Sequence, residues 1–299
     1  MKSKHNLFNE IPNEIIVYIF NSLSFKELIG IELINKKIQN IIISTKWSQK
    51  AKIFNNKQRT IEFVVKKYNF VNYLFYRSKM SNEILKSLSN CRSLDLSRCK
   101  NITDDNIKFL INCHSLNLSD NKNITGRNIQ YLTNCRRLNL SSCNKITDES
   151  LKYLTNICKL ELNFCGNITD IGVKYLTNCQ NLSLAWCNKI TDESVKLLGN
   201  CRKLCVQECG KITDKSIKML GKCKLLDLDS CHKITDDSIK YLTNCSELYL
   251  SGCYRITNAS VKLLDNCKKI DVTFCSNITR KCINELVKKG VEVNHDYYY

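Results

Sequence analysis

The stretch "LTNCSELYLSGC", from Leu242 to Cys253, contains the pattern that decides the fold. A near copy, "LTNICKLELNFC", runs from Leu154 to Cys165, but there Ile157 takes the place of the first cysteine and Cys158 follows it. Aligning the cysteines of all such stretches gives a period of 22 residues, which is typical of a solenoid built from stacked units. Nine units follow one another from Cys91 to Lys288 without an insertion.

The repeated positions of each unit predict one strand and one short helix. Position 1 is Cys in eight of the nine units, and so is position 9. Positions 4 and 6 are aliphatic and alternate with other residues, which predicts a short strand. The motif "ITD" at positions 12–14 predicts the N-cap and first turn of a helix, whose positions 17 and 20 point inward. A single unit cannot bury these side chains, so the units must stack along a parallel sheet.

This pattern resembles the leucine-rich repeats of the cysteine-containing subtype, "LxxLxLxxCxxITDxxLxxL", over 198 of the 299 residues, 91 to 288. The resemblance implies an α/β solenoid of 22-residue units with a parallel sheet on its concave face. Because units of this family contain about 20 to 29 residues, a 22-residue unit predicts a light convex side. We expect the side chains at positions 3, 5, 7 and 8 to face the hollow.

The 19 cysteines lack the spacing of a metal site. Zinc needs four converging ligands, which sequences usually supply as Cys-x-x-Cys pairs, and no such pair is present. Ile157 replaces Cys at position 1, which therefore asks for an apolar group. Asn121 replaces Cys at position 9, where a small donor can satisfy carbonyl groups of the neighbouring unit. We expect free thiols in a reducing compartment, Cys158 as a spare thiol near a strand start, and no metal or cofactor.

The segment from Ile11 to Trp47 does not repeat, and its pattern predicts three short helices. Pro12 suits the first helical position, and four aliphatic residues are expected to form one face of the first helix. These four are Ile15, Ile16, Ile19 and Leu23. Ser24 with Glu27 forms a capping box that opens the second helix. Ile38, Ile41 and Ile42 give the third helix its apolar side.

This segment resembles an F-box, whose pattern is "LPxEllxxIfxxLxxxdLxxlxxVcrxW". The matching residues are Ile11, Pro12, Glu14, Ile19, Phe20, Leu23, Leu28, Ile34 and Trp47. F-boxes are often followed by leucine-rich repeats of this subtype. The resemblance implies docking on a Skp-type adaptor of a cullin ubiquitin ligase through Ile11, Pro12, Glu14, Ile15, Ile19, Leu23 and Leu28. Alternatively, the three helices only cap the first repeat.

The chain is thus expected to contain four regions. Residues 1–50 are the F-box-like helical domain, and residues 51–90 are a linker and a degenerate capping repeat. Residues 91–288 are the nine leucine-rich repeats, and residues 289–299 are a closing strand and a tail that follow a helix stop at Gly290. In the degenerate repeat, Leu74, Met80, Leu85 and Leu88 fall near core positions.

The net charge of +18 would suit a nucleic-acid partner if the bases gathered in the hollow. They gather elsewhere, at position 18 and in the turn at positions 10 and 11. The lysines at position 18 are Lys108, Lys152, Lys174, Lys196, Lys218, Lys240 and Lys262. Acidic residues expected in the hollow are Asp95, Asp120, Glu161, Glu208, Asp227, Asp229, Glu247 and Asp271, with few bases. We therefore do not expect nucleic acid to bind there.

Aromatic residues interrupt the polar lining expected in the hollow. Phe164 and Trp186 occupy position 8 of neighbouring units, roughly one strand spacing apart. Exposed aromatic residues are favoured at the energetic centres of interfaces, although aromatic rings at this position can also lie flat over the rim and cover backbone. The candidate substrate contacts are Glu161, Phe164, Trp186, Glu208, Asp227, Tyr249, Asp271 and Phe274.

The sequence contains no nucleophile with a partnered histidine, no carboxylate pair in a cleft-forming loop and no Gly-rich phosphate cradle, so we do not expect an enzyme. It also lacks a run of 18 apolar residues and an N-terminal signal, so we expect an intracellular protein, cytoplasmic or nuclear, without a membrane span. The resemblance implies a substrate-recognition adaptor of an SCF-type ubiquitin ligase, whose concave face binds a protein substrate. The alternative is a leucine-rich-repeat interaction scaffold that does not engage a ligase. The composition is similar to that coded by AT-rich genomes, such as those of giant DNA viruses and amoebae, and a viral protein would act in its host cell.

Overall fold

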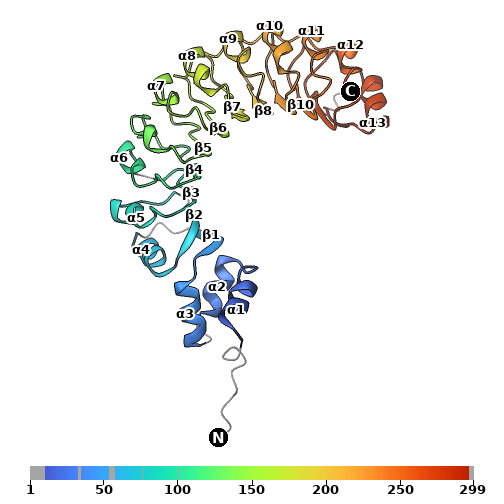
Figure 1. Ribbon diagram of the computed structural model, residues 1–299. Coiled ribbons are helices and arrows are strands. Elements are labelled where there is room, and N and C mark those ends of the chain that lie inside the picture. The colour runs from blue at the N-terminus through green and yellow to red at the C-terminus, as the bar shows by residue number, and fades with distance from the viewer. Residues whose placement is uncertain (1–10, 33–34, 54–57, 76, 100, 296–299) are drawn as a thin grey trace.

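The computed structural model of the chain describes residues 11–32, 35–53, 58–75, 77–99 and 101–295. These residues form an arc with short helices along its outer side and strands along its inner side (Figure 1). Within them, twelve strands make one sheet in which each strand pairs in parallel with the next along the chain. The predicted α/β solenoid with a parallel concave sheet is confirmed.

The nine predicted units each supply one strand, and equivalent residues pair at intervals of 22. These strands are β3 Ser93–Asp95, β4 Ser115–Asn117, β5 Arg137–Asn139, β6 Lys159–Glu161, β7 Asn181–Ser183, β8 Lys203–Cys205, β9 Leu225–Asp227, β10 Glu247–Tyr249 and β11 Lys269–Asp271. Positions 4 and 6, such as Leu160 and Leu162, are fully buried, whereas positions 3 and 5 face the hollow. The alternation read from the sequence therefore sets the register of the array.

Short helices follow the strands on the outer side. The α-helices of the repeats are α6 Asp104–Ile107, α7 Asp148–Leu151, α8 Asp170–Val173, α9 Asp192–Val195, α10 Asp214–Ile217, α11 Asp236–Ile239, α12 Asn258–Val261 and α13 Arg280–Lys288. Single 3-10 turns lie at η2 Ile129–Tyr131, η3 Lys174–Leu176 and η4 Lys218–Leu220. Most of these helices contain only four residues, which agrees with the light convex side expected from the unit length.

The cysteines at position 9 act as buried donors between units. The thiol of Cys165 donates to the carbonyl of Leu140 in the preceding unit at 3.3 Å, and that of Cys187 donates to Leu162 at 3.2 Å. Where Asn121 replaces Cys, its Nδ2 donates to the carbonyl of Leu96 at 2.9 Å, as the sequence predicted. Burial raises the pKa of the Cys165 thiol to about 12, so it stays protonated at neutral pH.

Cysteines at other positions also donate hydrogen bonds: the thiol of Cys201 donates to the carbonyl of Cys179 at 3.0 Å, and that of Cys205 to the carboxylate of Asp227 at 3.1 Å. Ile157 is 2% exposed in the apolar slot that Cys201 and its equivalents fill in other units. Cys158 is free and exposed directly before β6, which agrees with the prediction of a spare thiol near a strand start. Every cysteine of the chain is free, and no group of three or more His, Cys, Asp or Glu side chains in the described ranges is arranged to hold a metal ion.

The aspartate of the "ITD" motif links neighbouring units, a role that the sequence did not indicate. Asp236 accepts hydrogen bonds from the backbone nitrogen of Thr257 at 2.8 Å and from its hydroxyl at 2.6 Å. It also accepts one from the buried hydroxyl of Ser260. The same two bonds to the next threonine are made by Asp148, Asp170, Asp192 and Asp214. Burial acts to raise the pKa of Asp236, but the bonds from Ser260 and Thr257 outweigh it and lower that pKa.

The N-terminal segment forms the three predicted helices, α1 Asn13–Phe20, α2 Phe25–Ile31 and α3 Lys36–Ser44. The capping box of Ser24 and Glu27 is present, while Pro12 is the N-cap and not the first helical residue. The single apolar face predicted for α1 is wrong. Ile16 is buried, but Ile15 and Ile19 are 50% and 49% exposed, because the helical twist turns them away from the core that Ile16 faces.

The sheet begins earlier than the sequence indicated. Strand β1 Trp47–Ile53 starts inside the region assigned to the F-box, and the expected linker contains α4 Gln58–Lys67, β2 Phe70–Phe75 and α5 Asn82–Ser87. Two irregular rungs therefore precede the nine regular units. Tyr73 pairs with Leu94 in the sheet and is buried, whereas Leu74, predicted near a core position, faces the hollow side. The other predicted core residues of the degenerate repeat, Met80, Leu85 and Leu88, are buried. Aromatic core residues in place of leucines concealed the division of this region into two rungs.

The C-terminal end agrees with the prediction. Helix α13 is followed by Gly290, whose φ is +88°, and then by β12 Glu292–Asn294, which pairs with β11. The expected tail, Tyr297–Tyr299, lies outside the described residues, as do residues 1–10 and Ile34 of the F-box pattern.

We predict that Asp236→Ala lowers the free energy of unfolding by about 2–4 kcal/mol, because it removes the carboxylate that accepts three hydrogen bonds from Thr257 and Ser260 at the junction of two units. Asp237→Ala is the matched control, since Asp237 is exposed in the same helical turn, and it should change stability by less than about 0.5 kcal/mol. Urea unfolding followed by circular dichroism measures both. Equal losses for the two variants would contradict the structural role of the aspartate.

Candidate functional site

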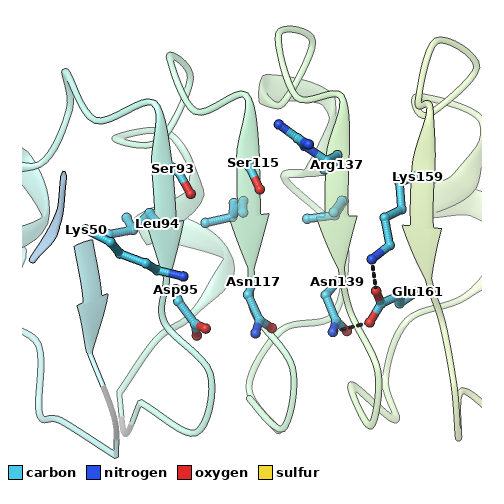
Figure 2. A pocket seen from close by; sticks show the side chains of 12 residues that line it. Lys50, Ser93, Leu94, Asp95, Ser115, Asn117, Arg137, Asn139, Lys159 and Glu161 are labelled. Atoms are coloured by element: carbon cyan, nitrogen blue, oxygen red, sulfur yellow. Dashed lines mark hydrogen bonds and ion pairs between the residues drawn. The ribbon is translucent and has the colours of Figure 1, made fainter. Parts of the chain in front are cut away.

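The first half of the hollow is lined mostly by polar side chains, two of which pair with Glu161. Side chains at positions 3 and 5 of β3 to β6 project from the sheet around a pocket of about 170 Å³ (Figure 2). Glu161, a predicted substrate contact, accepts a hydrogen bond from Asn139 at 2.6 Å and forms a 2.7 Å ion pair with Lys159. Its charge is therefore already compensated within the protein.

The second half of the hollow brings together three of the predicted contacts. Tyr249 lies between Asp227 and Asp271 at position 5 of three adjacent strands, in direct register with both. Its hydroxyl donates to Glu247 at 3.2 Å. Burial, followed by the neighbouring Glu247, raises the pKa of Tyr249, so this tyrosine is a neutral hydrogen-bonding group.

Asp229 is a feature of this region that the sequence reading placed in the hollow but did not single out. Its carboxylate accepts a hydrogen bond from the backbone nitrogen of Ser251 at 2.8 Å. Burial, together with the charges of Asp227 and Asp271, raises the pKa of Asp229 to about 7. Aspartates at positions 5 and 7 of one unit, with Asp271 at position 5 two units later, were the signal available in the sequence. The second half of the hollow thus holds more negative charge than its surroundings neutralise.

Phe164 and Trp186 form a stack at the edge of the hollow. Their ring centroids are 5.7 Å apart and their planes differ by 16°. The side chains are 52% and 41% exposed, so the rings do not lie flat on the backbone as covers. The structure therefore confirms that they are adjacent and leaves them accessible to a partner.

The backbone at position 8 has an unexpected conformation. All nine residues at this position have a φ between +55° and +71°; they are Arg98, Asp120, Ser142, Phe164, Trp186, Glu208, Ser230, Gly252 and Phe274. This left-handed region favours glycine and is unfavourable for bulky residues. Only Gly252 hinted at it in the sequence. The backbone alone does not explain why aromatic residues occupy two neighbouring units.

The two remaining predicted contacts differ in their relation to the stack. Glu208 occupies position 8 of the unit after Trp186, whose backbone nitrogen donates to the carbonyl of Gln207 at 2.9 Å. Phe274 is 66% exposed but lies three units beyond Glu208, beside Ile278 and Ile283. Glu208 therefore lies in the unit next to the stack, whereas Phe274 lies in a distant unit.

Three of the predicted adaptor contacts, Glu14, Ile15 and Ile19, lie exposed on α1, and the other four flank this helix or lie on α2. Pro12, Glu14, Ile15 and Ile19 are exposed, and Ile11 and Leu23 are half-buried. Tyr18, which sequence reasoning missed, is 79% exposed on the same helix. Leu28 is 0% exposed, because its side chain points from α2 into the core, so the prediction of Leu28 as a docking contact is wrong.

Comparisons with known proteins address the fold. A family model described as "Leucine Rich repeat" matches residues 131–155. A chain of the yeast Rad7 and Elc1 complex is similar with a TM-score of 0.67 and 16% identity, covering 96% of this chain and 89% of that one. This chain has the leucine-rich-repeat fold. An internalin, InlF from Listeria monocytogenes, is similar with a TM-score of 0.53 and 17% identity, covering 92% of this chain and 96% of that one.

No curated protein sequence matches the chain. Among the described residues, none of the helices has the length and apolar character needed to span a membrane.

We predict that Asp229→Asn removes a pH dependence of stability. The pKa of Asp229 in the folded protein lies above its unfolded value, so the stability that its protonation provides is fully present below about pH 4 and is lost as the pH rises through about 7. Between pH 5 and pH 8 the native protein should lose on the order of 1–2 kcal/mol relative to the Asn variant. The Asn side chain can still accept the bond from Ser251.

Urea unfolding at pH 5 and pH 8 measures the difference. The control is Asp237→Asn, which removes an exposed carboxylate on the outer side. A pH dependence that is identical in the native protein and in Asp229→Asn would contradict the assigned burial of this charge.

Proposed function

We propose that this leucine-rich-repeat protein is the substrate-recognition subunit of a cullin-based, SCF-type ubiquitin ligase. In this proposal, the N-terminal helices are an F-box that docks on a Skp-type adaptor, and the concave face binds a protein substrate. The observation that carries the proposal is the exposed apolar patch of Ile15, Tyr18 and Ile19 on α1. It lies in a helical segment that resembles an F-box, at one end of a fold used for protein–protein interaction.

The patch has the character of a surface that a partner covers. Each half-exposed isoleucine would contribute roughly 1 kcal/mol if a partner removed its remaining surface from water. Tyrosine adds a large side chain whose hydroxyl can stay solvated at an interface rim. Leu23 and Ile11 extend the patch as partly buried neighbours. Leu28 supports the helices from within and has no direct contact in the proposal.

The structural similarity to a chain solved in a complex supports a role beside a partner protein. The Rad7 and Elc1 structure is a complex of two proteins, and the likeness covers 96% of the present chain, more than the nine repeats alone. The proposed subunit is non-catalytic, and ubiquitin transfer belongs to other subunits of the ligase. It would act inside the cell, and in a host cell if the gene is viral.

A second candidate is an interaction scaffold in which the helices only cap the sheet. It is favoured by the packing of this segment on the first strand. The indole nitrogen of Trp47 donates to the carbonyl of Ile42 at 2.8 Å, and Trp47 is fully buried between the helices and the sheet. Such packing serves a cap as well as a docking domain.

We predict that Ile19→Asp weakens the affinity for a purified Skp-type adaptor at least tenfold. The substitution puts a charge into an apolar interface, where it would be buried without a partner. The matched control is Val287→Asp, because Val287 is 52% exposed on α13 at the other end of the array. Isothermal titration calorimetry with the full chain measures both affinities.

Binding by the native chain and by Val287→Asp, with loss only in Ile19→Asp, supports the proposal. Failure of the native chain to bind the adaptor favours the scaffold. Equal binding by all three chains would place the adaptor elsewhere and overturn the role of α1.

A further inference from the structure

The stack of Phe164 and Trp186 is followed along the same row by a carboxylate without a partner. In the described part of the chain, the carboxylate of Glu208 has no hydrogen bond or ion pair, and the indole nitrogen of Trp186 has no acceptor. Glu208 occupies the position next to Trp186, since the backbone bond from Trp186 to Gln207 aligns the two units. An aromatic face and an uncompensated negative charge therefore lie side by side.

The protein itself shows what position 8 side chains of adjacent units can do. At the other end of the row, the Nε of Arg98 lies 2.9 Å from Oδ2 of Asp120, one unit away. Phe164 and Trp186 make contact across the same one-unit spacing. Side chains at this position in neighbouring units thus reach each other, and a guanidinium group already pairs with a carboxylate in this row.

We propose that the Phe164–Trp186 stack and Glu208 form a subsite for an arginine side chain of the substrate protein. The guanidinium plane lies against the exposed face of Trp186 and donates two hydrogen bonds to the Glu208 carboxylate. This inference names the chemistry of the substrate segment and rests on the proposed role of the concave face in substrate binding.

The charges around the subsite fit a basic segment. Towards the first half of the hollow, Lys159 is neutralised by Glu161 at 2.7 Å. Towards the C-terminal end, Lys269 is paired with Glu292 at 2.5 Å. Between them, the carboxylates of Asp227 and Asp229 face the hollow, and burial and mutual repulsion raise the pKa of Asp229 to about 7. A cation bound here would relieve that repulsion.

Within its own unit, the bases nearest to Glu208 in sequence are Lys203 at position 3 of β8 and Lys211 in the turn at position 11. Both lysines are exposed, so solvent screens their charges, whereas Glu208 is half-buried beside the stack. Among the described residues neither lysine forms an ion pair with Glu208, so its carboxylate is left for a ligand.

Arginine fits the subsite better than lysine does. Its guanidinium is planar, stacks on aromatic faces and matches a carboxylate with two parallel hydrogen bonds. An ammonium group is compact and strongly hydrated, and it offers no flat face to the ring. The indole is also the best aromatic partner for a cation. The subsite should therefore separate two side chains of equal charge.

The chain carries a natural reporter for this test. It has two tryptophans, of which Trp47 is fully buried and Trp186 is 41% exposed. A ligand on the stack changes the emission of Trp186 and leaves that of Trp47 unaffected. The probes are amidated octapeptides that alternate glycine with arginine, lysine or glutamate, titrated into the full chain.

We predict a saturable change of tryptophan emission with the arginine peptide, an affinity at least threefold weaker with the lysine peptide and no change with the glutamate peptide. Glu208→Gln should weaken arginine-peptide binding about tenfold, which corresponds to about 1.4 kcal/mol. The control is Glu149→Gln, because Glu149 is 81% exposed on the helical side and removes the same charge. It should leave the affinity unchanged.

Equal affinities for the arginine and lysine peptides, or equal losses in Glu208→Gln and Glu149→Gln, would overturn the subsite. So would the absence of any emission change. Adaptor binding is measured on the same proteins and tests a different claim. If the adaptor binds and the arginine peptide does not, the ligase proposal stands and the subsite fails. If the peptide binds and the adaptor does not, the arginine subsite is supported, and the protein is an interaction scaffold instead of a ligase subunit.

Discussion

The whole architecture depends on hydrogen bonds that side chains of one unit make to the next. A unit of 22 residues is too small to satisfy its own buried polar groups, so its carbonyls and amides need donors and acceptors from a neighbour. The thiol of Cys187 meets the carbonyl of Leu162, and the carboxylate of Asp236 meets Thr257. These bonds recur along the array, so each unit holds the next at a fixed spacing.

Because the units are held at a fixed spacing, side chains at equivalent positions of neighbouring units lie next to one another in the hollow. Because the inward positions are committed to packing, positions 3, 5, 7 and 8 can vary between units and change the surface of the hollow without disturbing the core. Position 8 also carries a left-handed backbone in every unit. Phe164 and Trp186 stack there because the neighbouring units hold them in register. A regular scaffold thus presents an irregular surface, which suits selective binding of a partner.

Much of this fold could be predicted from the sequence, because nine units provide their own internal comparison. The substitutions Ile157 and Asn121 identified the roles of positions 1 and 9. One degenerate repeat was predicted before the nine units, but its division into rungs at β1 and β2 was not, since Tyr73 and Phe75 fill core places that leucine fills elsewhere. The buried Leu28 and the exposed Ile15 depend on how helices pack, which a matching motif does not reveal. The contact from Asp236 to the following unit is likewise a property of the stack and not of its own segment.

The two surfaces lie on one continuous array, and the account assigns them to different partners. α1 lies at one end of the arc, and the strands β3 to β11 line its inner side (Figure 1). Because hydrogen bonds between units already hold the array together, a partner bound at α1 should not change the rate of amide exchange in the strands. Hydrogen–deuterium exchange of the full chain, alone and with a Skp-type adaptor, tests this most directly. The account predicts that the adaptor slows amide exchange only in residues 13–31. Slower exchange confined to β3 to β11, or no change in any segment, would contradict it.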